Sequence, residues 1–240
     1  MKSKLTKVDI EATLKDKDLS RGDFLSRISE FSNLLNFTFW TFGIRHPVPI
    51  SKPTLIIHSN ISDIEYPDHF SERHLKEDAV LRHCYTSTLP LVWNADDASS
   101  TPFSQKGLLT QGIRFGWSIS MRDVTGTLAW FTLARNTSPV SPDELDENEY
   151  SMIWLAYATH SKLHMNPAHE GPKDGRPNLS PREREVMKWT AAGKTAFEIG
   201  KILGIAETTC IFHITNATRK LGGVNKTHAI ARAALMGLII

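Results

Sequence analysis

The sequence has few of the residues that mark disulfide-rich, metal-binding or membrane proteins. Its only cysteines are Cys84 and Cys210, too few and too far apart in sequence for a disulfide framework or a zinc site. No apolar run approaches the roughly 18 residues of a membrane span. The polar start MKSKLTKVDIEATLKDKD also lacks the apolar core of a signal peptide. We therefore expect a cytoplasmic protein that does not enter a membrane.

Catalytic motifs are missing as well. No glycine-rich phosphate-binding loop occurs, and the acidic and histidine residues between 68 and 74 lack a metal-ligand spacing such as His-Glu-x-x-His. His83 and Cys84 are adjacent in sequence, which does not suit a base and its nucleophile. We expect no catalytic residue, no metal site and no cofactor.

The strongest pattern is a series of helix start and stop signals after Ser180. Two capping boxes, SPRE at 180–183 and TAFE at 195–198, predict helices that start at Pro181 and Ala196 and end at Gly193 and Gly204. The second of these should turn Ile199, Ile202 and Leu203 inward. A third helix is expected to bury Cys210, Ile214, Ala217 and Leu221 and to end at Gly222, and Asn225 caps a fourth.

Two short helices joined by a tight glycine turn are typical of a helix-turn-helix, whose second helix enters the major groove of DNA. The charge agrees, because residues 178–240 hold nine Lys or Arg against four Glu, a net charge of +5, while the whole chain carries +2. The sequence therefore predicts a C-terminal all-α domain of four helices that binds double-stranded DNA. Its expected contact residues are Lys194, Thr195, Thr208, Thr209, Ile211, Phe212, Thr215, Asn216, Arg219, Lys220, Asn225 and Lys226.

Residues 165–178, MNPAHEGPKDGRPN, are rich in proline, glycine and charge and have no apolar period. This composition predicts an exposed linker between a first domain at 1–164 and a DNA-binding domain at 179–240. In the first domain, the strand-like runs FTFWTFGIR, TLIIHS, FGWSISM and TLAWFTLAR lie between a helix from about Asp23 and a long helix after Ser141-Pro142-Asp143-Glu144. Antiparallel strands flanked by helices predict an α-β-α sandwich, and the whole chain is then α+β.

The run LSPREREVMKWTAAGKTAFEIGKILGIAETTCIFHITNATRKLGGVNKTHAIARAALMGLI resembles the DNA-binding domain of LuxR-type quorum-sensing regulators along its full length. It departs from the family at three positions near the third helix. Ala206 replaces a capping serine, Cys210 replaces a valine, and Ile211 stands where relatives often carry lysine. Without that cation, the salt slope of DNA binding should be lower by about 0.9.

The motifs GIRHPVPISKP, LVWNADD, QGIRFGWSI and LARN resemble the acyl-homoserine-lactone-binding domain of the same family. This resemblance implies that Asp78 accepts a hydrogen bond from the ligand amide and that the Trp93 indole N–H meets the lactone carbonyl. It also places Thr41 and Thr132 at hydroxyl positions within reach of the acyl-chain carbonyls. Without the family, Asp78 is more typical of a solvated turn and Trp93 of core packing.

The aromatic wall of the family's pocket is altered. Family spacing counted back from Asp78 puts Glu65 where a tryptophan floors the lactone and His69 where a tyrosine contacts the amide carbonyl. If the chain is one residue shorter before Asp78, Tyr66 and Phe70 supply the walls instead. Otherwise the pocket is more polar, and the ligand is not a simple acyl lactone or there is none. The second interpretation is slightly favoured, although an unpaired buried Glu65 would cost several kcal/mol.

Together these patterns predict a homodimeric transcriptional regulator that reads a two-fold DNA site and senses an acyl-homoserine lactone or a related small amphiphile. The alternative is a ligand-independent regulator, or an antagonist that forms heterodimers with a lactone receptor. A third hypothesis, motivated by Ala206 and Ile211, is a ligand-binding buffer with impaired DNA contact.

Overall fold

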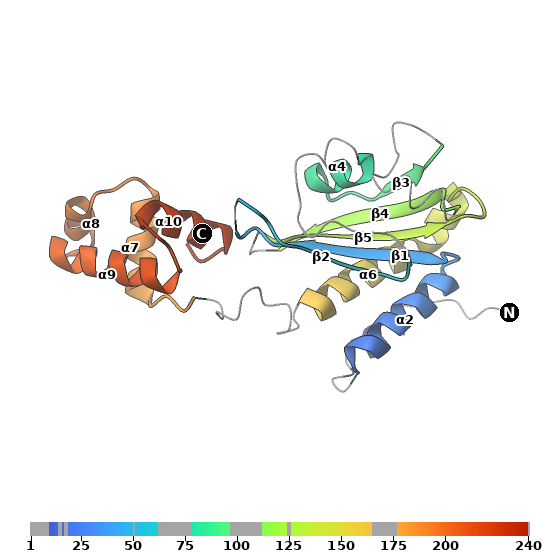
Figure 1. Ribbon diagram of the computed structural model, residues 1–240, viewed down its shortest axis with the longest axis horizontal. Coiled ribbons are helices and arrows are strands. Elements are labelled where there is room, and N and C mark those ends of the chain that lie inside the picture. The colour runs from blue at the N-terminus through green and yellow to red at the C-terminus, as the bar shows by residue number, and fades with distance from the viewer. Residues whose placement is uncertain are drawn as a thin grey trace. The chain divides into compact units, whose positions relative to one another are not determined.

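The computed structural model describes residues 10–13, 16, 19–49, 51–61, 78–96, 112–123, 126–164 and 177–239. The chain forms two compact units, the first made of Met1–Arg122 and Thr127–His169 and the second of Asp123–Gly126 and Glu170–Ile240. Figure 1 labels the helices and strands of each unit. Most of the expected linker at 165–178 lies outside the described residues.

A five-stranded antiparallel sheet in the order β2-β1-β5-β4-β3 forms the centre of the first unit. The strands are β1 (Phe39–Arg45), β2 (Leu55–Ser59), β3 (Leu91–Asn94), β4 (Phe115–Arg122) and β5 (Leu128–Arg135). The four strand-like runs of the sequence correspond to β1, β2, β4 and β5. The sequence prediction missed β3, because four residues are too few to show an alternating pattern.

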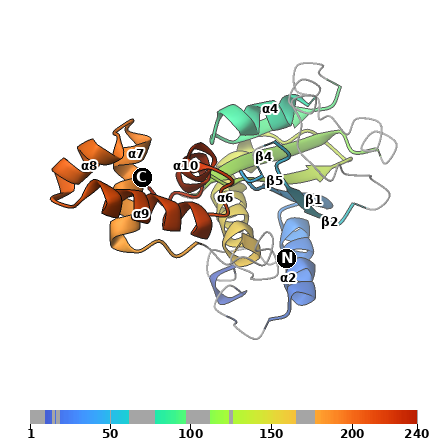
Figure 2. The same ribbon diagram turned by 60° about the vertical axis from the view of Figure 1, so that its left-hand side comes forward.

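Helices cover both faces of this sheet, as Figures 1 and 2 show. α2 (Arg21–Leu34) and α6 (Pro142–His164) lie on one face, and α4 (Ala79–Thr86) lies on the other. The predicted α-β-α sandwich is therefore confirmed. The first helix, expected from about Asp23, begins two residues earlier at Arg21, because Ser20 is the N-cap and its hydroxyl accepts from the Asp23 N–H at 3.2 Å.

Alternate side chains of the central strands enter two different cores, as the pleat of a strand requires. On the α2 and α6 face, Trp40, Phe42 and Ile44 of β1 pack with Trp117 of β4 and Phe131 of β5. On the α4 face, a smaller cluster joins both sheet and helix residues: Ile61, Val80, Cys84, Trp93, Ile113, Trp130 and Ala134. The α4 face also carries the buried hydroxyls of Ser118 and Ser120, so it is the less completely apolar of the two.

The second unit consists of α7 (Pro181–Ala191), α8 (Ala196–Leu203), α9 (Glu207–Lys220) and α10 (Lys226–Leu235). Both predicted capping boxes are present, with reciprocal hydrogen bonds between Ser180 and Glu183 and between Thr195 and Glu198. The prediction that Ile202 points inward is wrong, because this side chain is exposed. α8 is only eight residues long and buries a narrow stripe at Ile199 and Gly200.

Candidate ligand site and DNA-binding surface

A row of hydroxyl groups crosses the sheet beneath α4. The strand register places Ser118 of β4, Thr132 of β5, Thr41 of β1 and Ser59 of β2 side by side. Ser118 Oγ lies 2.8 Å from Thr132 Oγ1, and Thr41 Oγ1 lies 3.0 Å from Ser59 Oγ. We call these four residues the hydroxyl row. It brings Thr41 and Thr132, the two predicted ligand hydroxyls, onto directly paired positions.

Trp93 forms one boundary of the hydroxyl row. Its ring lies so close to Gly116, its partner on β4, that a Cβ at this glycine would be 2.2 Å from the ring atom Cζ2. The buried indole N–H donates to Ser118 Oγ at 3.0 Å. The predicted ligand donor is therefore bonded to the hydroxyl row, and Ser118 holds its orientation.

Trp130 forms the opposite boundary, two residues along β5 from Thr132 and hence about 7 Å away along the strand. A Cβ at its partner Gly43 would lie 2.1 Å from Trp130 Cζ2, so the indole ring occupies the space that a side chain on β1 would fill. The two tryptophans thus lie on either side of this polar row. A further buried hydroxyl, that of Ser120, lies opposite Trp130 on the same face and donates to the Ser87 carbonyl.

Asp78 is the N-cap of α4. Its Oδ1 accepts from the Leu81 N–H at 2.8 Å, and the residue is buried. The interpretation as a solvated turn residue is therefore wrong. Burial, and after it the Asp78 carboxylate, raises the pKa of the Cys84 thiol to about 12, so this thiol is protonated and unreactive near neutral pH.

The other predicted ligand residues, Glu65, Tyr66, His69 and Phe70, lie outside the described residues, so the two alternatives for the aromatic wall both stand. Sequence reasoning missed Ser118, Ser59 and Trp130. The signal for Ser118 was present in FGWSISM, where small polar residues alternate with large apolar ones on a strand covered on both faces. Ser59 and Trp130 become relevant only through the strand register.

The helix-turn-helix consists of α8, a turn at Gly204 and α9. Gly204 has φ 65° and ψ 35°, the left-handed conformation that glycine adopts at low cost after a helix. Ala206 occupies the N-cap of α9 and makes no side-chain cap hydrogen bond, as the sequence predicts for the loss of the family serine. Cys210 is fully buried, and this burial raises the pKa of its thiol.

Most of the predicted DNA-contact residues are exposed. Ile211 and Phe212 project from the middle of α9, Arg219 and Lys220 from its end, and Lys194 precedes α8. Thr209 and Asn216 are half-buried. Lys220 also donates to buried Glu183 at 2.7 Å, so part of its charge is used inside the domain. The exposed members of the set are Lys194, Thr195, Thr208, Ile211, Phe212, Thr215, Arg219, Lys220, Asn225 and Lys226.

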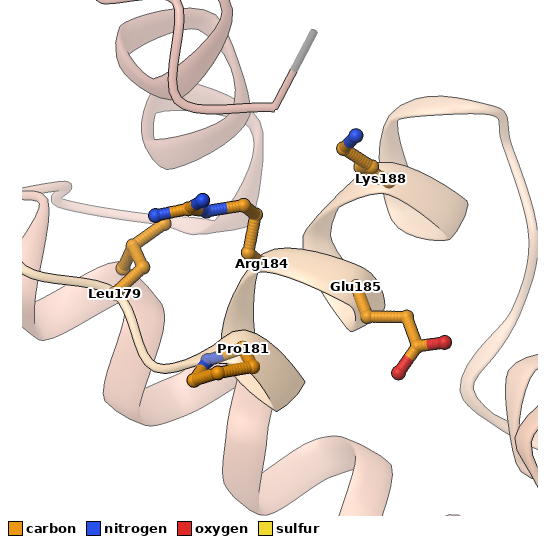
Figure 3. Close-up of a pocket in the computed structure, with 5 residues that line it drawn as sticks. All are labelled: Leu179, Pro181, Arg184, Glu185 and Lys188. Carbon is orange, nitrogen blue, oxygen red and sulfur yellow. The ribbon is translucent and has the colours of Figure 1, made fainter.

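A separate hollow of about 330 Å³ lies at the start of α7 and is shown in Figure 3. Leu179 and Pro181 line it together with Arg184, Glu185 and Lys188. None of the five belongs to the predicted ligand or DNA set. Within the ranges that the structure describes, no group of three potential ligands could hold a metal ion, and no helix is long and apolar enough to cross a membrane.

Comparison with known protein families assigns a family to each of the two units. Residues 20–163 match the family described as an autoinducer binding domain, and residues 177–233 match the family of bacterial regulatory proteins of the luxR type. The chain belongs to the LuxR family. It is a transcriptional regulator that combines a ligand-responsive domain with a helix-turn-helix DNA-binding domain.

Named relatives regulate in both directions. The chain is 31% identical over 214 residues to the transcriptional activator AnoR of Acinetobacter nosocomialis, covering 88% of this chain and 90% of that protein. It is 33% identical to the transcriptional repressor ThaA of Burkholderia thailandensis, with 92% of each chain covered. The crystal structure of Escherichia coli SdiA is similar over 98% of both chains, with a TM-score of 0.78 and 26% identity. SdiA in complex with octanoyl-rac-glycerol is similar over 97% of this chain and 94% of that chain, with a TM-score of 0.75 and 25% identity.

Proposed function

We propose that the α4 face of the sheet binds an acyl-homoserine lactone or a related neutral amphiphile. The observation that carries this proposal is the hydroxyl row, which lies between Trp93 and Trp130 on a face that also carries apolar side chains. Sites for small molecules commonly combine apolar walls with a few convergent polar groups. Hydroxyls, an indole N–H and the Asp78 carboxylate suit a ligand that has carbonyl acceptors and one N–H donor. The complex of the relative SdiA with octanoyl-rac-glycerol supports the broader class of neutral amphiphiles.

In the proposed ligand site, Asp78, Trp93, Thr41 and Thr132 contact the polar part of the ligand. Glu65 and His69, or Tyr66 and Phe70 in the other register, complete its wall. Binding then acts by linkage, because a ligand that binds only the folded sensor domain stabilises it and favours the form that presents the DNA-binding surface. The proposed domains are residues 1–164, a linker at 165–178, and residues 179–240.

The test is a thermal shift of the full chain against acyl-homoserine lactones of graded chain length and against octanoyl-rac-glycerol. A ligand at 100 times its dissociation constant adds about 2.7 kcal/mol, or roughly 5–10 °C for a domain of this size. The variant Asp78→Asn keeps a good N-cap for α4 but removes the charge-assisted bond. We expect it to keep its melting temperature and to lose most of the ligand shift.

The second candidate is a ligand-independent regulator or an antagonist that pairs with a lactone receptor. It is favoured by the hydrogen bonds among Trp93, Ser118 and Thr132, which satisfy these groups within the protein itself. The same titration decides between the two candidates. A folded protein that shifts with no lactone and no acylglycerol contradicts the ligand proposal and supports this one.

We further propose that two copies of the chain pair through the outer face of α6 and bind a two-fold DNA site in the cytoplasm. Tyr150 and Tyr157 are seven residues apart on this face and are 64% and 48% exposed. Large exposed aromatic side chains on one helix face are typical of protein interfaces. The predicted DNA contacts on α9 and at the starts of α8 and α10 would then act in pairs.

Sedimentation of matched variants tests this dimer. Tyr157→Glu places a charge on the α6 face, while Val92→Glu places the same charge on β3, an exposed strand at the edge of the sheet. We expect Tyr157→Glu to shift the chain towards monomer and Val92→Glu to leave it dimeric. If Val92→Glu dissociates the dimer and Tyr157→Glu does not, the interface lies at the sheet edge instead of on α6. A wild-type chain that is monomeric at all concentrations would contradict the homodimer.

A further inference from the structure

The middle of α9 presents an apolar surface to solvent. Ile211 is 49% exposed and Phe212 is 61% exposed, although both belong to the second helix of a helix-turn-helix. Exposed apolar residues are common when scattered singly over a surface. Here two large ones are adjacent, on the helix that this motif inserts into the major groove.

The same part of α9 has no cationic side chain that could donate hydrogen bonds to bases, and the one amide side chain of the helix, Asn216, is half-buried. The sequence contains no lysine or arginine between Lys201 and Arg219. Thr215 Oγ1 donates to the Ile211 carbonyl at 2.9 Å, so its hydroxyl proton is used by the helix itself. His213 is half-buried, and its ring makes an edge contact with Phe212 at 5.8 Å between centroids.

Only one base presents an apolar group in the major groove. Thymine carries a 5-methyl group there, whereas guanine, adenine and cytosine present hydrogen-bonding atoms. Arginine is the usual partner of guanine, and the only arginine of α9 lies near its C-terminal end at Arg219. An apolar patch in mid-helix therefore fits A·T pairs better than G·C pairs.

We propose that Ile211, Phe212 and the methyl group of Thr215 read thymine 5-methyl groups, so that each operator half-site has A·T pairs opposite the middle of α9. This inference rests on the proposed placement of α9 in the major groove. The net charge of +5 on residues 178–240 supplies phosphate attraction, which positions the helix without reading sequence. Specificity at the centre of the half-site then comes from methyl contacts.

The experiment begins by selecting duplexes from a random library with the full chain, with and without the lactone panel. Each thymine of the selected site is then replaced in turn by deoxyuridine, which keeps the base pairing and removes only the 5-methyl group. We expect one or two positions per half-site at which this change weakens binding about fourfold, which corresponds to about 0.8 kcal/mol for one buried methyl group.

Protein variants then identify the contacting side chain. In Ile211→Ala or Phe212→Ala, which keep good helix formers at exposed positions, the deoxyuridine penalty at the contacted thymine should fall below about twofold. Ile202→Ala is the matched control, because Ile202 is a comparably exposed isoleucine on α8. We expect this variant to keep the full penalty of about fourfold.

Four results would overturn the inference. A deoxyuridine scan without any penalty would mean that no methyl group is read. If the deoxyuridine penalty is the same in the wild type, Ile211→Ala and Phe212→Ala, it comes from the shape of the duplex and not from contact with Ile211 and Phe212. If no duplex is enriched under any condition, the proposed DNA contacts fail, and the inference fails with them. Duplexes enriched with G·C pairs at the half-site centre would leave the DNA contacts standing and overturn the inference alone.

Discussion

Arg135 at the end of β5 and Glu144 in the first turn of α6 form a buried ion pair with two parallel hydrogen bonds. The distances are 2.6 Å from Nη1 to Oε1 and 2.6 Å from Nη2 to Oε2, and the side chains are only 4% and 15% exposed. Arg135 also donates to the carbonyls of Ser138 and Pro139. A single guanidinium therefore fixes the connection from the sheet to the long helix.

Removing one partner of this pair should be costly. Glu144→Gln leaves the guanidinium buried without its counter-charge, and we expect a loss of about 3–5 kcal/mol in the free energy of unfolding of the first unit. Urea unfolding followed by tryptophan fluorescence measures this loss, because five of the six tryptophans precede residue 165. The control is Glu30→Gln, whose pair with Arg27 is more than half exposed and should contribute less than about 1 kcal/mol. Equal losses in both variants would contradict this account.

Two glycines of the sheet, Gly43 and Gly116, should resist replacement by alanine, because a Cβ at either would overlap a tryptophan ring. At Gly43 a Cβ would lie 2.1 Å from the Trp130 ring, so Gly43→Ala must displace a buried indole and should lower stability by about 1–3 kcal/mol. Adding Trp130→Phe to Gly43→Ala makes room for the Cβ, and the combined loss should be smaller than the sum of the two single losses. Gly22→Ala, at an exposed position of α2, is the control and should be neutral or stabilising. Strict additivity at Gly43 and Trp130 would contradict the close approach.

Signals written in the local sequence predicted much of the fold, whereas short elements without such a signal were missed. The capping boxes at Ser180 and Thr195 and the strand-like runs of β4 and β5 are local signals, and the structure follows them. Neither α4 nor β3 was predicted, because eight and four residues carry too little periodicity. The long helix α6 was predicted from Ser141, but its Glu144 carboxylate binds Arg135, a tertiary contact that no local pattern reveals.

The residues of the candidate ligand site also differ in how far the sequence could predict them. Asp78, Trp93, Thr41 and Thr132 were predicted only because the chain resembles a family, since each is an ordinary residue in its local sequence. Ser118, which accepts a hydrogen bond from Trp93 and so orients it, is brought to that position by the pairing of β3 with β4 and of β4 with β5. Pairing between strands depends on the whole sheet, so a single strand does not predict it.

Acid should destabilise the second unit through Glu183. Burial raises the pKa of this carboxyl, but hydrogen bonds from Lys220 Nζ and the Ser180 N–H, both at 2.7 Å, outweigh burial and hold the pKa below its usual value. A carboxyl with a lowered pKa in the folded state stabilises the fold above its unfolded pKa. That stabilisation is lost as the pH falls through the folded pKa.

Thermal unfolding between pH 7 and pH 3 tests this linkage. Glu183→Gln should lower the melting temperature of the second unit at pH 7 and reduce its dependence on pH below about 5. Glu185→Gln, on the same helix and paired with Arg182 near the surface, should leave both almost unchanged. An unchanged acid dependence in Glu183→Gln would exclude this carboxyl as its source.

Restoring the missing cap of α9 should stabilise the DNA-binding domain. Ala206 already has the extended backbone of an N-cap, with φ −66° and ψ 147°, but no side-chain acceptor. Ala206→Ser supplies a hydroxyl acceptor for the N–H groups of the first turn and should add about 1 kcal/mol, a rise of several degrees in melting temperature. Ala192→Ser, at the C-cap of α7, introduces the same group where no N–H donor needs it and should add nothing. Because the serine lies at the start of α9, Ala206→Ser should also hold this helix more firmly for DNA. If stability rises while DNA affinity stays constant, fraying of α9 does not limit binding.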